Sequence, residues 1–116
     1  MFAFENITLS SDGECLSASC RISADQAFFT GHFPGAPIMP AVVQLQMIEA
    51  LLQTRRDWPS TLAGGRAIKF LRPVVPGSEL QIQLARGTSG TLRFSLEQDG
   101  CAVAKGTVQA AGNGIG

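Results

Sequence analysis

Residues 31–52 read GHFPGAPIMPAVVQLQMIEALL, and the character of this stretch changes at its middle. Its first half carries prolines at positions 34, 37 and 40, which remove backbone donors and bias the preceding residues to extended geometry. From Ala41 to about Arg56 no residue breaks a helix, and Pro40 suits a first turn because its φ angle is already helical. We therefore predict an extended segment that leads into a long helix, with Arg55 and Arg56 at its negative end.

The predicted helix is apolar on nearly every side. Its apolar members are Val42, Val43, Leu45, Met47, Ile48, Ala50, Leu51 and Leu52. Such a helix is normally surrounded by protein and does not merely lie on a surface. The polar residues Gln46, Glu49 and Gln53 are spaced three and four apart, so they share one face. The sequence thus predicts a central helix with a single polar face.

The rest of the chain alternates apolar and polar residues, which is typical of strands with one buried face. The segments expected to be strands are 7–10, 15–22, 66–74, 79–85, 91–97 and 101–110. Turn residues join them over short distances, which favours an antiparallel sheet. The fold class expected is α+β, with an antiparallel sheet wrapped around one long central helix. We expect a single domain over residues 1–112 and a flexible C-terminal tail over 113–116.

Composition limits the function classes. The chain has 116 residues, 45% of them hydrophobic, and a formal net charge of zero, so long-range attraction to nucleic acid is not expected. Three cysteines without a secretory signal argue against a disulfide framework. One histidine and scattered cysteines make no metal site, and no cofactor is expected. Polar residues interrupt the longest apolar stretch, so it is no membrane span, and a cytoplasmic location is the expectation.

The charges are unevenly distributed along the chain. One stretch contains only two acidic residues, Asp57 and Glu79, but six cations: Arg55, Arg56, Arg66, Lys69, Arg72 and Arg86. These cations are either ordinary solvated ends of strands and loops or a basic patch that docks an acidic partner.

The proline-rich segment, together with a second marker, resembles the hot-dog-fold 3-hydroxyacyl-acyl-carrier-protein dehydratases. The residues that match the family's first pattern are His32-Phe33-Pro34, Pro37, Pro40 and Ala41-Val42, followed by the helix. The second marker, a strand that ends in a Pro-Gly turn, is matched by IKFLRPVVPGSEL from Ile68 to Leu80. The resemblance covers roughly residues 20 to 110.

This resemblance implies a dimer of hot-dog subunits with an active-site tunnel at their interface. The substrate implied is a 3-hydroxyacyl thioester on an acyl carrier protein, from which water is eliminated. His32 is the implied base, because an imidazole with a pKa near neutrality suits proton abstraction. Free N–H groups at the start of the helix would hold the enolate oxygen. The expected substrate-binding residues are Phe33, Gly35, Pro40, Ala41, Val42 and Arg72. Arg66, Lys69 and Arg72 would meet the carrier protein.

Position 46 departs from the family pattern, because the helical acid of these dehydratases falls there and this chain has Gln46. A side-chain amide cannot deliver a proton at neutral pH. Glu49, one turn later, could supply the acid, although a helix residue paired with an arginine is the simpler interpretation. Alternatively, His32 acts alone while Gln46 positions the substrate. The third alternative is a non-catalytic thioester-binding or heterodimer-partner subunit. A hot-dog thioesterase is a further possibility, against which the His-Phe-Pro pattern argues.

Overall fold

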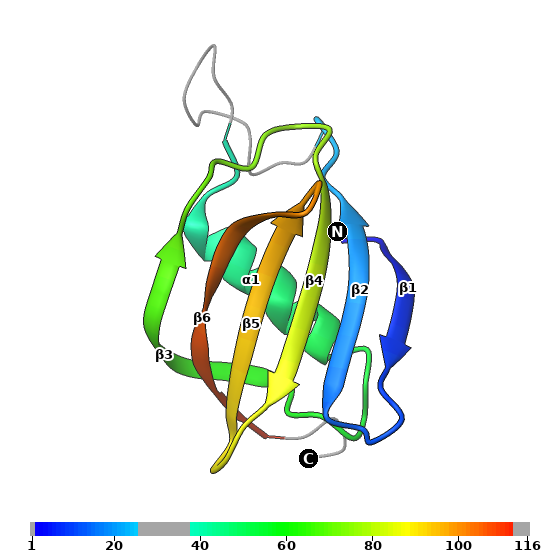
Figure 1. Cartoon of the computed structure of the whole chain (residues 1–116), viewed down its shortest axis with the longest axis vertical. Helices are drawn as coiled ribbons and strands as arrows, with labels where there is room; N and C mark the ends of the chain where they lie inside the picture. The colour runs from blue at the N-terminus through cyan, green and yellow to red at the C-terminus, as the bar shows by residue number, and fades with distance from the viewer. Residues whose placement is uncertain (1, 26–37, 113–116) are drawn as a thin grey trace.

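In the computed structural model, which describes residues 2–25 and 38–112, six strands and one helix form two layers (Figure 1). The elements are β1 (Phe4–Leu9), β2 (Cys15–Arg21), α1 (Ala41–Leu52), β3 (Thr61–Phe70), β4 (Glu79–Arg86), β5 (Thr91–Gln98) and β6 (Cys101–Ala111). The predicted α+β architecture, an antiparallel sheet wrapped around one helix, is confirmed. The expected tail over 113–116 lies outside the described residues.

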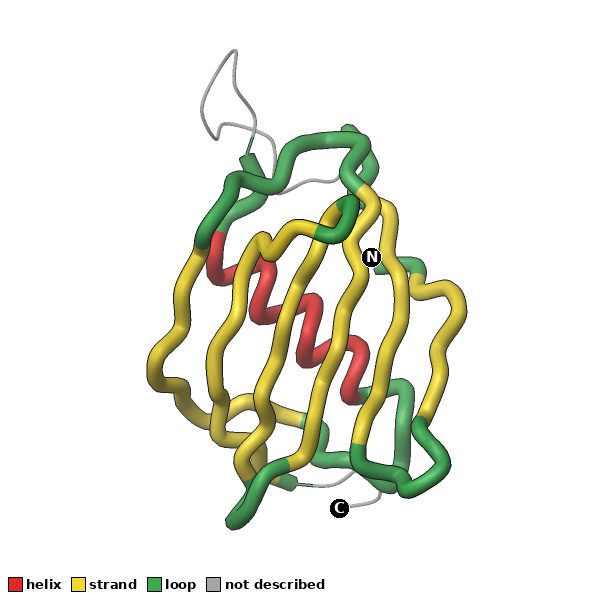
Figure 2. The backbone as a smooth tube through the Cα atoms, in the orientation of Figure 1, coloured by secondary structure: helices red, strands yellow, loops and turns green. Residues whose placement is uncertain are grey.

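The strands form one sheet in the order β1-β2-β4-β5-β6-β3, and every neighbouring pair is antiparallel. The chain leaves β2, passes through α1 and returns as β3 at the far edge, beside the last strand β6. Figure 2 shows α1 running diagonally behind the sheet, across several strands. Within the described residues β3 is therefore an edge strand, with one side of its backbone unpaired by the sheet.

The core lies between the sheet and one face of α1. Alternate residues of the inner strands point to the helix, as Leu80, Ile82 and Leu84 of β4 illustrate, all nearly without solvent exposure. The buried residues of α1 are Val43, Gln44, Met47, Ile48, Leu51 and Leu52. Their spacing marks a single face of the helix. The opposite face, which the composition predicted to be covered as well, is open in this chain.

The helix α1 begins at Ala41 as predicted, whereas its C-terminal end lies four residues before Arg56. Pro40 is the N-cap, with φ −62° but an extended ψ of 152°, so it precedes the helix and does not occupy its first turn. The helix ends at Leu52 and not near Arg56. The reason is local, because the hydroxyl of Thr54 donates to the carbonyl of Leu51 (2.7 Å) and closes the last turn. No basic residue lies in the last turn, so the predicted dipole interaction is absent.

The segment after the helix is held by charged side chains. Arg55 pairs with Asp57 (N···O 3.0 Å), and this hydrogen-bonded guanidinium holds the pKa of the Asp57 carboxyl below its usual value. Arg86 of β4 donates to the carbonyl of Asp57 and lies over the ring of buried Trp58, 4.3 Å from the ring centroid. Two of the six cations in the basic stretch therefore have structural contacts within this loop.

A bulge in β3 brings Ile68 onto the inner surface of the sheet. The strand register shifts between Arg66 and Lys69, and Ala67 has a φ of 53°. A Cβ on Gly106 would lie 2.8 Å from the Cα of Ile68, and a Cβ on Gly65 would lie 2.4 Å from its Cδ1. The two glycines thus leave the space that Ile68 fills, which fixes the position of β3 against β6.

Substitution of Gly106 by alanine tests this packing. We expect Gly106→Ala to lower the free energy of unfolding by about 1–3 kcal/mol, because the neighbouring atom is backbone and cannot easily move. Urea denaturation would measure the change. Gly64→Ala is the matched control, since nothing lies within 4 Å of a Cβ at that position. Equal stabilities of the two variants would contradict the explanation.

Candidate functional site

An open groove of about 350 Å³ lies between the exposed face of α1 and β3. Its lining residues are Val42, Leu45, Gln46, Glu49, Leu62, Gly64, Gly65, Ile68 and Val108. Most of these side chains are apolar, and Val42 is 61% exposed. The groove is therefore an apolar surface with two polar side chains, which is the composition of a site for a largely apolar ligand.

The two polar side chains of the groove come from α1. Val42, Gln46 and Glu49 follow one another at spacings of four and three residues, so they line one face of the helix. Gln46 is exposed, and its amide has no hydrogen-bond partner among the described residues. It is therefore free to donate to, or accept from, a molecule that enters the groove.

Glu49 connects the helix to the edge strand. The backbone N–H of Leu62 donates to Oε2 of Glu49 with an N···O distance of 2.9 Å, and both residues are half-buried. The arginine partner expected for Glu49 is thus replaced by a backbone N–H, because β3 passes beside this face of the helix. In the described part of the chain the other carboxyl oxygen has no partner, and it remains available to the groove.

The start of α1 presents unpaired donors. Val43 and Gln44 both donate their N–H to the carbonyl of Pro40, at 3.1 Å each, and no side chain caps the helix. Within the described chain the N–H groups of Ala41 and Val42 have no acceptor. Because unpaired amides at a helix start carry partial positive charge, they favour an oxyanion. Val42 also lines the groove, so the start of the helix adjoins it.

A second hollow, of about 320 Å³, surrounds the start of the helix. Its lining residues are Ile38, Met39, Pro40, Ala41, Gln44, Phe70, Leu71, Arg72 and Pro73. Gln44 is buried and donates to the carbonyl of Met39 (3.3 Å), whereas its own carbonyl oxygen has no partner. The expected substrate contacts Pro40, Ala41 and Arg72 meet here.

Three predicted residues lie outside the described part of the chain: His32, Phe33 and Gly35. Their positions relative to Gln46 and Glu49 therefore stay predictions. The β3 side of the groove was not predicted from the sequence; it consists of Leu62, Gly64, Gly65 and Ile68. Gly65 was the available signal, because a glycine within a strand can mark a close approach, here to Ile68.

The described residues lack two further classes of site. They contain no group of three or more His, Cys, Asp or Glu residues that could hold a metal ion. Nor does any helix in that part of the chain have the length and apolar character needed to cross a membrane.

Comparison with protein families and known sequences gives a consistent result. The model of the ApeI-like family, described as ApeI dehydratase, matches residues 8–107. The 3-hydroxyacyl-[acyl-carrier-protein] dehydratase FabZ of Acidiphilium cryptum is 36% identical over 78% of this chain and 62% of that relative. FabZ of Polynucleobacter necessarius is 33% identical over 86% of this chain and 70% of that relative. The match thus covers less than two thirds of the Acidiphilium relative.

Solved structures share the fold at low sequence identity. A chain of the dehydratase heterocomplex ApeI:P from Xenorhabdus doucetiae superposes with a TM-score of 0.77 at 20% identity, covering 97% of each chain. A Streptococcus mutans protein bound to acetyl CoA gives a TM-score of 0.61 at 13% identity, covering 97% of this chain and 90% of that one. The hot-dog fold expected from the sequence is confirmed.

Removal of the Glu49 carboxylate tests its link to β3. We expect Glu49→Ala to lower the free energy of unfolding by about 1–3 kcal/mol, because it leaves the Leu62 N–H without an acceptor. Glu49→Gln keeps an acceptor oxygen and should cost less. Urea denaturation measures both, and hydrogen exchange at the Leu62 amide should accelerate in Glu49→Ala alone. Gln46→Ala is the control, and a loss of the same size there would contradict the assignment.

Proposed function

The chain belongs to the ApeI-like dehydratase family, and from this premise we propose that it eliminates water from a 3-hydroxyacyl thioester carried on an acyl carrier protein. The observation that carries the proposal is the groove along α1, whose apolar lining carries the polar side chains of Gln46 and Glu49 and includes Val42, whose N–H has no acceptor among the described residues. FabZ relatives at 33 to 36% identity are dehydratases of this class, which supports the substrate type.

The elimination needs three contributions from the protein. A base removes the proton next to the thioester carbonyl, and His32, from the segment just before the helix, is the proposed base. Negative charge then develops on the thioester oxygen, and the N–H groups of Ala41 and Val42 are the proposed donors to it. Finally, the bond from carbon to the hydroxyl breaks, and that oxygen takes up a proton to leave as water. The products are an enoyl thioester and water.

The proton that the leaving hydroxyl takes up must come from a group other than Gln46, because a side-chain amide cannot supply a proton. Glu49 is one candidate: Oε2 accepts the Leu62 N–H, and the second oxygen is unpaired in the described residues. In the other version His32 returns the proton that it removed, while Gln46 holds the substrate hydroxyl by a hydrogen bond. Both versions keep the substrate along the same face of α1.

A second subunit is part of the proposal. β3 leaves one edge of its backbone unpaired in the sheet, and the groove beside it is open with Val42 exposed. A second hot-dog subunit, either a copy of this chain or a homologue, would pair this edge and close the groove into a tunnel. One relative in structure is a dehydratase heterocomplex, which makes a hetero-dimer a reasonable form. Arg72, exposed beside the helix start, is the proposed contact to the carrier protein.

A specific observation favours a second candidate function. The family acid is replaced by Gln46, and the nearby carboxylate Glu49 is already engaged by a backbone N–H. A chain with these features could bind acyl thioesters without dehydrating them, or could serve as the partner of a catalytic homologue. Substitutions at positions 32 and 46 separate the two candidates.

Loss of the imidazole tests the proposed base. We expect His32→Ala to lower turnover of a 3-hydroxyacyl-carrier-protein substrate by about 10²–10⁴-fold, the usual contribution of a general base. Mass spectrometry of the enoyl product would measure the rate. Binding of the same acyl carrier protein serves as the control and should change little. Equal turnover by the variant and the natural chain would reject the assignment.

Introduction of a carboxylate at position 46 distinguishes an enzyme from a non-catalytic subunit. In a working dehydratase another group already delivers the proton, so Gln46→Glu should change turnover by less than about tenfold. Gln53→Glu adds the same charge two turns away, outside the groove, and is the matched control. A gain of about 10²-fold or more that is specific to Gln46→Glu would instead favour the second candidate.

A further inference from the structure

Four cations gather on the side of the sheet that faces away from α1, and we call this group the outer cationic face: Arg66, Lys69, Arg93 and Lys105. All four are exposed. Lys69 lies directly opposite Lys105 in the pairing of β3 with β6. In the next row Thr107 of β6 lies between Arg66 on one side and Arg93 on the other. The cations thus come from three adjacent strands and occupy two neighbouring rows.

The described residues do not neutralise this charge. Like charges directly opposite on antiparallel strands destabilise a sheet, so the Lys69 and Lys105 pair costs stability. Among the described residues, no carboxylate lies within 4.0 Å of any of the four cations, and the ion pairs there are Arg21 with Glu79 and Arg55 with Asp57. An arrangement that weakens the sheet and has no internal partner indicates an anionic partner outside the chain.

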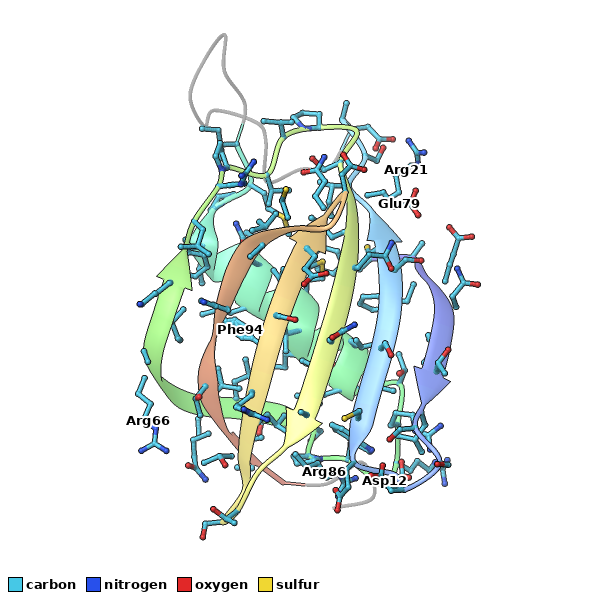
Figure 3. All side chains as sticks on the ribbon, viewed as in Figure 1. Asp12, Arg21, Arg66, Glu79, Arg86 and Phe94 are labelled. Carbon is cyan, nitrogen blue, oxygen red and sulfur yellow. The ribbon has the colours of Figure 1, made fainter. Side chains whose placement is uncertain are left out.

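The surface beside these cations is hollowed. A trough of about 620 Å³ extends over β2, β4, β5, β6 and β3. Its polar lining consists of Lys69, Arg93, Lys105, Cys15, Ser17, Gln83, Ser95 and Thr107, and it includes no carboxylate. Glu97 shares this face but lies on the other side of the Lys69–Lys105 row from Arg66 and Arg93. It is opposite Gln81. The Arg21–Glu79 pair lies at the opposite end of the sheet from Arg66 (Figure 3). The charged residues that line the trough are therefore all cations.

We infer that the outer cationic face docks an acidic segment of a partner protein. Five strands at about 4.8 Å spacing make the trough roughly 19 Å wide, which is the scale of a polypeptide element and exceeds a single small anion. Two copies that met through this face would bring their cations together with no carboxylate in the trough, so like-charge repulsion opposes a second copy of this chain as the occupant.

Arg66 and Lys69, which the resemblance assigned to the carrier protein together with Arg72, belong to this face and do not line the hollow that contains Arg72. The docking surface is therefore separate from the carrier-protein contact proposed at Arg72 and goes beyond the proposed function. It lies on the face of the sheet opposite α1, whereas the groove lies between α1 and β3. Binding at the outer cationic face can therefore exist without dehydration, and dehydration without it. The two proposals fail independently, because one is measured as binding without substrate and the other as turnover.

A labelled oligoglutamate of about 20 residues is the probe, with fluorescence anisotropy at low salt as the measurement. We expect it to bind the natural chain and to bind Lys105→Glu at least about tenfold more weakly, because attraction becomes repulsion. Arg56→Glu makes the same change of net charge at an exposed site outside the trough and should alter binding by less than about twofold. Lys105→Glu also gives Lys69 an opposite charge, so its melting temperature should hold or rise.

Amide chemical shifts of the natural chain give a second, variant-free measurement. Oligoglutamate should shift the amides of Ser17, Gln83 and Ser95, which line the trough, more than those of α1. Four results would overturn the inference: equal losses for Lys105→Glu and Arg56→Glu, shifts centred outside the trough, tighter binding of an oligouridylate of equal charge, or loss of self-association in Lys105→Glu without the probe. The last two would assign the face to nucleic acid and to a second copy.

Discussion

A twelve-residue helix with apolar side chains around its circumference cannot be covered by one sheet. In this chain the sheet covers the face formed by Met47, Ile48, Leu51 and their neighbours, and these residues are fully buried. Val42, at the start of the helix, remains 61% exposed. Exposed apolar surface of this kind is costly in water, so a partner subunit or an acyl chain gains by covering it. The groove exists because the helix is apolar on nearly all sides, whereas the single sheet covers only one of its faces.

The position of β3 decides how wide the groove is. The strand is the last of the sheet and has only β6 as a neighbour, so it could move away from the helix. Two contacts oppose such movement: the N–H of Leu62 donates to Glu49, and Ile68 fills the space left by Gly65 and Gly106. Each contact restricts the movement of β3, which forms one wall of the groove. The features that stabilise the edge strand are thus the same features that shape the candidate site.

Strands and helices that carry a short-period pattern could be predicted from the sequence, whereas the pairing of residues far apart in the chain could not. Alternation over residues 79–85 and 91–97 identified β4 and β5 because a strand with one buried face repeats every two residues. The sequence predicts that α1 ends near Arg56, four residues beyond its actual end, because the Thr54 hydroxyl closes the last turn and no helix propensity reveals that contact. The neighbours of Glu49 and Lys69 depend on strand order and register, which short-range patterns do not contain. His32 carries the strongest sequence signal but lies outside the described residues.

The hydrogen bond at Glu49 does not exclude this residue from acid catalysis, since a carboxyl group has two oxygens with separate roles. Oε2 can keep accepting the Leu62 N–H while the other oxygen carries a proton toward the groove. The same bond would hold the carboxyl in one orientation, which is useful for a proton donor because geometry must be fixed before transfer. A glutamate at position 46 would lack this tether, since Gln46 is exposed and has no partner in the described chain. An acid at position 49 in place of position 46 is therefore chemically coherent. Both positions lie on the same face of α1, but only the side chain at position 49 is held by a hydrogen bond in the described residues.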